Sequence, residues 1–302
     1  MVSTLKIAGF DVFRYIRTQV THYARNFRTF SRQRPVAAFW IGVIIFLVFM
    51  SIAAPVVSPK DPYIPDFLKV TNSPDAENFF GTDFLGRDQL TRIIYGGRTS
   101  LFIGLISVFL GVGAGSLWGL ASGYLGGKFD LISQRLLEIL MAIPGLILAM
   151  ILMFILGASV WTLIVAIAFT RLAFGARVIR AVSLSVRETT YVEAARSTGA
   201  PTWRVIVFHV APQTFAPFLV LFTTNIGIAI LIEASLGFIG LGIAPPTPTW
   251  GSMLGEAASN LEPFWWLVFF PGLFITIAVL AFNLAGAGLQ DALDPRNRGT
   301  IE

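Results

Sequence analysis

The chain has 302 residues, of which 55% are hydrophobic and 13% are charged, and its net charge is +5. Soluble domains carry about a quarter of charged residues, and a mean hydropathy of +0.74 indicates an integral membrane protein instead. The basic residues flank apolar segments, where membrane orientation requires them, so we exclude nucleic-acid binding. The absence of cysteine excludes disulfides and thiol chemistry.

The first 34 residues are basic and polar and contain no motif that we can assign. Residues 11–34 place apolar side chains at helical spacing, namely Phe13, Ile16, Val20, Tyr23, Phe27 and Phe30. This pattern predicts a basic amphipathic helix on the lipid of the inner leaflet, with a disordered basic arm as the alternative. The apolar run that follows is too long for the h-region of a cleavable signal peptide, so we expect a membrane span.

Six segments are apolar over about the 20 residues that a helix needs to cross a bilayer. They are residues 35–57, 101–125, 136–156, 160–174 (with 179 as an alternative end), 215–236 and 264–285. Little more than Gly157-Ala158-Ser159 separates the third span from the fourth, so we expect a tight hairpin there. The predicted fold class is therefore an all-α integral membrane protein with six transmembrane helices.

Basic residues predict the orientation of these spans. The N-terminal segment has seven Lys and Arg residues against one acid, Asp11, whereas residues 237–263 contain no Lys or Arg. Placing the N-terminus in the cytoplasm also places there the basic segment 187–213 and the C-terminal tail. The prediction is N-in and C-in.

Glycines recur every four residues along the second span, at Gly111, Gly115, Gly119 and Gly123. Such a stripe lets a neighbouring helix backbone approach closely, so we interpret it as a packing device. Three prolines fall within predicted spans and are expected to kink them: Pro144, Pro217 and Pro271.

Three ionisable residues lie near or inside the apolar zones, where charges are costly and usually face protein or water. Glu138 is placed at the inner end of the third span, where a negative charge favours a helix N-terminus. Arg171 is expected to snorkel towards the cytoplasmic surface. Glu233 is the acid most enclosed by apolar sequence, and it is a candidate for the substrate pathway, with a structural hydrogen bond to a neighbouring helix as the alternative.

A motif stands in the basic segment 187–213, between the fourth and fifth spans. It consists of Glu193, Ala194 and Ala195, followed by Gly199 and Pro212. Gly199 is expected to end a short helix. The motif resembles the EAA loop of bacterial ABC importer permeases, which docks onto the ATPase subunit. The family usually has Leu before the closing proline, where this chain has Ala211.

Further segments narrow the resemblance to the dipeptide/oligopeptide/nickel permeases, and within them to the second, or "C", permease. They are residues 80–88, the run Tyr95-Gly96-Gly97-Arg98, residues 245–254 and residues 291–296. The resemblance implies an N-terminal segment 1–34, a first span and outer loop 35–100, a permease core 101–290 and a tail 291–302. It also implies a homologous "B" permease, two ATPase subunits and an extracytoplasmic binding protein as partners, in a bacterial inner membrane.

The chain itself has no phosphate loop for ATP. Gly126-Gly127-Lys128 has the wrong upstream spacing and is followed by Phe129. We therefore expect no cofactor and no catalysis in this chain, with ATP and Mg bound by the partner ATPases. His22 and His209 are too few and too far apart in sequence for a metal centre, and we expect His209 to be a surface or interface residue.

The resemblance makes peptides the default substrate, with nickel chelates, glutathione or oligosaccharides as alternatives. A secondary transporter would usually show more spans and inverted repeats, and an intramembrane enzyme would need a catalytic cluster. Neither feature is present in the sequence.

Overall fold

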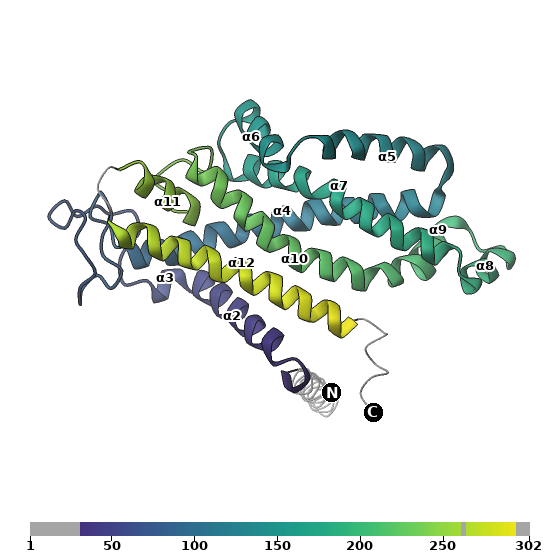
Figure 1. Ribbon diagram of the computed structural model, residues 1–302, viewed down its shortest axis with the longest axis horizontal. Coiled ribbons are helices and arrows are strands. Elements are labelled where there is room, and N and C mark those ends of the chain that lie inside the picture. The colour runs from purple at the N-terminus through teal and green to yellow at the C-terminus, as the bar shows by residue number, and fades with distance from the viewer. Residues whose placement is uncertain (1–30, 261–263, 294–302) are drawn as a thin grey trace, which may run out of the picture.

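The computed structural model describes residues 31–260 and 264–293, and within these ranges the regular elements are helices. They are α2 (Pro35–Ile52), α3 (Ala54–Val57), α4 (Gln89–Leu125), α5 (Gly127–Ala142), α6 (Gly145–Leu156), α7 (Val160–Arg187), α8 (Thr190–Ser197), α9 (Thr202–Val205), the π-helix η1 (Ile206–Val210), α10 (Ala211–Phe238), α11 (Trp250–Ala258) and α12 (Trp265–Leu293). The long helices form an elongated bundle, with α11 near one end and α8 at the other (Figure 1). The predicted helix at residues 11–34 lies, up to residue 30, outside the described residues.

The core of the bundle lies where α4, α7 and α10 pack together. Its buried members include Ile103 and Val108 of α4, Leu163 and Ile167 of α7, and Ile230 of α10. Because these side chains are buried, the three helices pack directly against one another without lipid between them.

The glycine stripe of α4 lies against α7, as predicted. Gly111 faces Ala168, and Gly119 faces Ala176. A Cβ atom at Gly119 would lie 2.2 Å from the carbonyl oxygen of Ala176, far inside van der Waals contact, so only glycine permits this approach. Because the residue numbers rise together on both helices, α4 and α7 run parallel.

The structure corrects the bounds of the predicted third span, 136–156, and confirms the kink expected at Pro144. The span consists of α5 and α6, which begin at Gly127 and meet at an angle of 86°. The break lies at Ile143 and Pro144, because a residue before proline is driven out of the helical region, and Ile143 is extended at φ −94° and ψ 125°.

The bent pair completes the count of membrane crossings. Within the described residues, five single helices are long and apolar enough to span a membrane, and α5 with α6 makes a sixth if the pair is one span. Since α4 and α7 run parallel, the chain between them has to return across the bilayer. Gly157 and Ala158 join α6 to Ser159, whose hydroxyl caps α7 by accepting the Thr162 N–H at 3.1 Å, which gives the predicted tight connection.

Other helices extend beyond the predicted apolar runs. α4 starts at Gln89 rather than 101, because the Asp88 carboxylate caps it by accepting the Thr91 N–H at 2.8 Å. Its 37 residues make a rod about 55 Å long, against a hydrocarbon thickness of about 30 Å. Pro217 and Pro271 lie inside α10 and α12, which continue through them.

The two ends of the described chain meet on one side of the membrane. A guanidinium nitrogen of Arg34, before α2, lies 2.8 Å from a carboxylate oxygen of Asp291, near the end of α12. The start of α2 and the end of α12 both lie towards the end of the bundle that carries α8 (Figure 1). This arrangement is consistent with the N-in, C-in orientation, which stays a prediction.

Candidate functional site

The EAA motif forms a separate helix–turn–helix, α8 and α9, that projects from the bundle between α7 and α10 (Figure 1). Val192 is completely buried and Ala195 packs partly against the core, so these two residues anchor α8. Glu193 and Ala194 are exposed on the other face. The motif thus presents an acid and a small apolar residue outwards from an anchored helix.

The turn after α8 depends on Gly199. This residue has φ +80°, a left-handed conformation that L-residues adopt at a cost. Its N–H bonds to the Arg196 carbonyl at 2.9 Å, and the Ala200 N–H bonds to the Ala195 carbonyl at 3.2 Å. These two bonds make a Schellman motif, which satisfies the last carbonyls of the helix. No atom lies within 4 Å of a Cβ built on Gly199, so the requirement is for its backbone conformation and not for space.

Pro212 fixes the start of α10. It has no N–H, and in an α-helix its ring would crowd the carbonyl of Phe208. The preceding turn widens to the π-helix η1, in which the Ala211 N–H bonds to the Ile206 carbonyl, five residues back. The proline of the motif therefore marks the point where the projecting segment becomes a membrane span.

A hollow of about 590 Å³ lies beside α8 and is open to the surroundings. Small apolar residues, including Ala194 and Pro201, line it together with Arg204 and His209. The Tyr191 hydroxyl donates to the His209 carbonyl at 3.2 Å and closes one side. His209 is therefore at the surface of this segment, and no group of three metal-ligating side chains is found in the described part of the chain.

Tyr124 joins the projecting segment to the bundle. It is buried at the end of α4, and its carbonyl accepts a hydrogen bond from Arg187 at 3.1 Å. The Arg196 guanidinium lies 4.9 Å from the centre of the Tyr124 ring, and its Nε donates to the Tyr124 hydroxyl at 3.1 Å. No sequence pattern predicted this contact, because hydropathy does not report contacts between residues that are distant in the chain.

A second ionic contact holds α5 on α7. The Arg180 guanidinium donates to both carboxylate oxygens of Asp130, with nitrogen–oxygen distances of 2.5 and 2.6 Å. Paired hydrogen bonds of this kind fix orientation as well as distance. The first turn of α5 is thereby tied to the last third of α7.

At the opposite end, a buried ionic network connects the outer loop, α4 and α11. Asp83 lies 2.7 Å from Arg87 and 3.3 Å from Arg92, and Arg92 lies 3.2 Å from Glu256 of α11. Asp83, Arg87 and Arg92 are buried, so each charge depends on its partners. The segment 80–88, which carried part of the resemblance, is therefore structural in this conformation.

Trp250 seats α11 on α4. It is buried, its ring N–H donates to the Ile93 carbonyl at 3.0 Å, and its backbone N–H donates to the Ser100 hydroxyl at 3.3 Å. The ring packs against Gly97, where a Cβ atom would lie 2.9 Å from Trp250 Cζ2. Residues 95–98 and 245–254, which both carried the resemblance, therefore contact each other through Gly97 and Trp250.

Glu233 is completely buried on α10, where this helix meets α4 and α11. The hydroxyls of Ser100 and Thr249 face its carboxylate. Neither carboxylate oxygen makes a hydrogen bond of ordinary geometry with the described residues.

The structure corrects the position of Glu138. It lies in the last turns of α5 rather than at a helix N-terminus, and it pairs with Arg135 at 2.8 Å on an exposed face. Arg171 is half-buried at the α5–α6 break, with a guanidinium nitrogen 3.3 Å from a Cβ built on Gly145. The break, at the proline where the sequence predicted a kink, lies beside Arg171.

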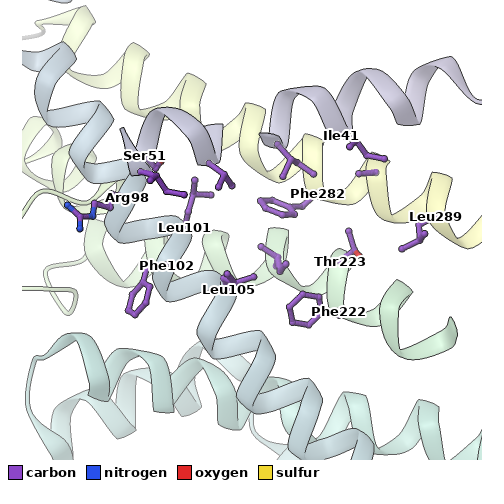
Figure 2. A pocket seen from close by; sticks show the side chains of 15 residues that line it. Ile41, Ser51, Arg98, Leu101, Phe102, Leu105, Phe222, Thr223, Phe282 and Leu289 are labelled. Carbon is purple, nitrogen blue, oxygen red and sulfur yellow. The ribbon is translucent and has the colours of Figure 1, made fainter. Parts of the chain in front are cut away.

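An apolar groove of about 600 Å³ lies between α2, α4, α10 and α12. Figure 2 shows side chains from these helices facing one another across it, among them Ile41, Leu105, Phe222 and Phe282. Its lining is almost entirely hydrocarbon, so the groove offers few hydrogen bonds to a polar solute. Arg98 stands at one end of it (Figure 2).

An all-helical bundle with membrane-length helices and a projecting helix–turn–helix is the architecture that the resemblance to membrane transport subunits implies. In agreement, the family model described as "Binding-protein-dependent transport system inner membrane component" matches residues 111–299. The match covers more than half of the chain, which therefore belongs to this family. The chain is a non-catalytic, multi-pass permease component of the inner membrane, and its class implies ATPase and binding-protein partners.

Individual relatives agree with the expected resemblance to importer permeases. The "Probable D,D-dipeptide transport system permease protein" of Escherichia coli (strain K12) is 38% identical over 257 residues, which cover 85% of this chain and 86% of the relative. The "Glutathione transport system permease protein" of Escherichia coli O1:K1 / APEC is 38% identical over 286 residues, which cover 94% and 93%.

Proposed function

We propose that this permease imports di- or oligopeptides together with a homologous "B" permease, each forming half of the pathway. In this permease the docking site would be the helix–turn–helix of α8 and α9, which we call the coupling segment. One ATPase subunit would dock on it and a second on its counterpart in the partner permease, and a binding protein would deliver the peptide outside. ATP binding would then move the coupling segments and switch the pathway between two packed states. Two relatives of equal identity are named for a dipeptide and for glutathione, itself a small peptide, and this supports a peptide-like substrate.

The geometry of α8 is the observation that carries the docking proposal. Val192 anchors one face, whereas Glu193 and Ala194 face outwards beside an open hollow. We infer that Glu193, Ala194 and Ala195 form the contact with the ATPase. Gly199 and Pro212 would hold this contact in place at its two ends.

Glu233 remains a candidate for the pathway, with the structural role as the alternative. Its complete burial between α10, α4 and α11 supports the structural role. Contact with a transported peptide would require this packing to open.

The test is co-purification of the tagged chain in mild detergent, followed by mass spectrometry and an ATPase assay. Recovery with a second permease and ATPases, with hydrolysis stimulated by peptide-loaded binding protein, is the expected result. Stimulation by nickel chelates, glutathione or oligosaccharides, but not by other peptides, would replace the peptide assignment. Isolation of a stable chain with no ATPase would contradict the docking proposal.

A pair of variants at one position tests the coupling segment itself. Gly199→Ala has to adopt φ +80° at a cost of about 1–2 kcal/mol, whereas Gly199→Asn tolerates this conformation better. We expect Gly199→Ala to lower transport and ATPase recovery while membrane insertion is unchanged, and Gly199→Asn to retain most of both. Equal, normal uptake by both variants would count against the docking role.

A further inference from the structure

An arginine without a partner lies towards the outer end of α4. Arg98 is exposed, and among the described residues its side chain makes no hydrogen bond or ion pair. It lies about 14 Å along the axis from Ser107, the middle of α4. This distance is close to half of the roughly 30 Å hydrocarbon thickness. If Ser107 lies at the bilayer centre, Arg98 is at the boundary of the hydrocarbon, where its charge can meet water or a polar ligand.

The nearby acids do not supply the counter-ion of Arg98. Asp83 lies against Arg87 and Arg92, and Glu256 lies against the same two arginines. The outer ionic network is therefore complete without Arg98, whose positive charge is left for a group outside the described chain.

A hollow of about 410 Å³, which we call the outer cup, opens beside Arg98. Hydroxyl groups from three parts of the chain line it: Tyr63 of the loop before α4, Tyr95 and Thr99 of α4, and Thr247 of the loop before α11. The Thr99 hydroxyl already donates to the Tyr95 carbonyl at 3.3 Å, which leaves the hydroxyls of Tyr63, Tyr95 and Thr247 as possible donors to a ligand. One cation among several donors suits an anionic group with oxygen acceptors.

Arg98 borders both the outer cup and the apolar groove, and the direction of its side chain shows that its charge does not face the groove. In Figure 2 its guanidinium points away from Leu101 and Phe282 and from the other side chains of the groove. The groove is lined almost entirely by hydrocarbon, so a bound anion would lose hydration there without replacement. The outer cup can supply both charge and hydrogen bonds.

We propose that Arg98 and the outer cup form a subsite for the free carboxylate of a transported peptide. The guanidinium would bind the carboxylate through two parallel hydrogen bonds, and the surrounding hydroxyls would satisfy its remaining lone pairs. This inference rests on the proposed peptide function and adds the chemical group that the permease itself recognises.

The test measures uptake by the complete transporter in proteoliposomes, with binding protein, for a dipeptide with a free carboxylate and for its C-terminal amide. Arg98→Gln removes the charge, Arg98→Lys keeps it without the paired geometry, and Lys60→Gln is a control on the same outer face. The acid-to-amide ratio of each variant is divided by that of wild type, so the selectivity of the binding protein cancels. We expect Arg98→Gln to lower this ratio about tenfold or more, Arg98→Lys to lower it less, and Lys60→Gln to leave it unchanged.

Other outcomes would overturn the inference in distinguishable ways. Equal loss of acid and amide uptake in Arg98→Gln would assign Arg98 to folding or to the partner permease. An unchanged ratio would show that Arg98 does not bind the carboxylate. The same assays in vesicles of phosphatidylcholine, with and without phosphatidylglycerol, test for a lipid phosphate. A phosphatidylglycerol requirement that disappears in Arg98→Gln would assign the charge to lipid. Failure of the wild-type transporter to take up either peptide would instead refute the proposed function, and this subsite with it.

Discussion

The contact between α4 and α7 allows a sharp test, because one helix offers both a crowded glycine and an open one. At Gly115, a Cβ atom would lie 2.2 Å from the Leu172 carbonyl oxygen and 3.0 Å from the Ala176 nitrogen. At Gly113, two residues earlier on the same helix, no atom lies within 4 Å of the corresponding position. Alanine at the two sites therefore changes helix propensity alike and packing very differently.

The magnitude follows from these distances. A carbon atom approaches a carbonyl oxygen closely at about 3.3 Å, so Gly115→Ala has to move the helices apart by roughly 1 Å. Overpacking of this kind costs about 1–3 kcal/mol, whereas alanine in place of glycine within a helix gains up to about 1 kcal/mol. We expect Gly115→Ala to be the less stable variant and Gly113→Ala to be neutral or stabilising; because the propensity gain is common to both, their unfolding free energies should differ by the overpacking cost, roughly 1–3 kcal/mol.

The assay is unfolding of the purified protein in mild detergent by increasing fractions of sodium dodecyl sulfate, followed by tryptophan fluorescence. A lower midpoint for Gly115→Ala than for Gly113→Ala is the expected result. Equal midpoints for the two variants would refute the reasoning, because the stripe would then contribute no close packing.

Three further predictions concern polar contacts. Tyr124→Phe removes the hydroxyl that Arg196 contacts and keeps the ring. We expect about fivefold less uptake per ATP hydrolysed in proteoliposomes, and an unchanged ratio of transport to hydrolysis would contradict this. Glu233→Gln replaces a completely buried acid with a neutral amide of similar shape, and peptide competition assays should show substantial uptake with unchanged preference; a changed preference would place the residue in the pathway. Glu256→Gln weakens a charged contact of buried Arg92, so thermal unfolding should show a loss of about 1–2 kcal/mol, and an unchanged melting midpoint would argue that the network is not stabilising.

Sequence patterns predicted the features of the fold that depend on local physics. The apolar runs located the spans because a bilayer imposes a length on each helix, and the spacing of Gly111 to Gly123 predicted a close helix contact because it repeats near the helical period. Gly199 was expected to end a helix, and its positive φ shows that it does. Each of these predictions needed only neighbouring residues.

The features that sequence reasoning missed depend on long-range contacts. Pro144 predicted a kink in the third span, but the sequence did not indicate that the chain turns by 86° there or that the first helix of the pair begins at Gly127. Hydropathy placed the start of α4 at 101, since the capped and buried polar turns before that residue are stabilised by α11 and the outer loop. The Tyr124–Arg196 contact joins residues 72 positions apart, and no local pattern reports it.

Helix α4 connects the two ends at which the proposed functions lie. It carries Arg92 of the outer network and, about 48 Å further along its axis, Tyr124 in contact with Arg196 of the coupling segment. Because its glycine stripe lies against the α7 backbone, α4 and α7 resist separation and are expected to move as one body. A displacement of α8 by a docked ATPase would then tilt α4 and α7 together as a rigid unit instead of bending α4. The same tilt would move Arg98 and the outer cup, so release of a bound carboxylate would follow from the motion that the coupling segment starts.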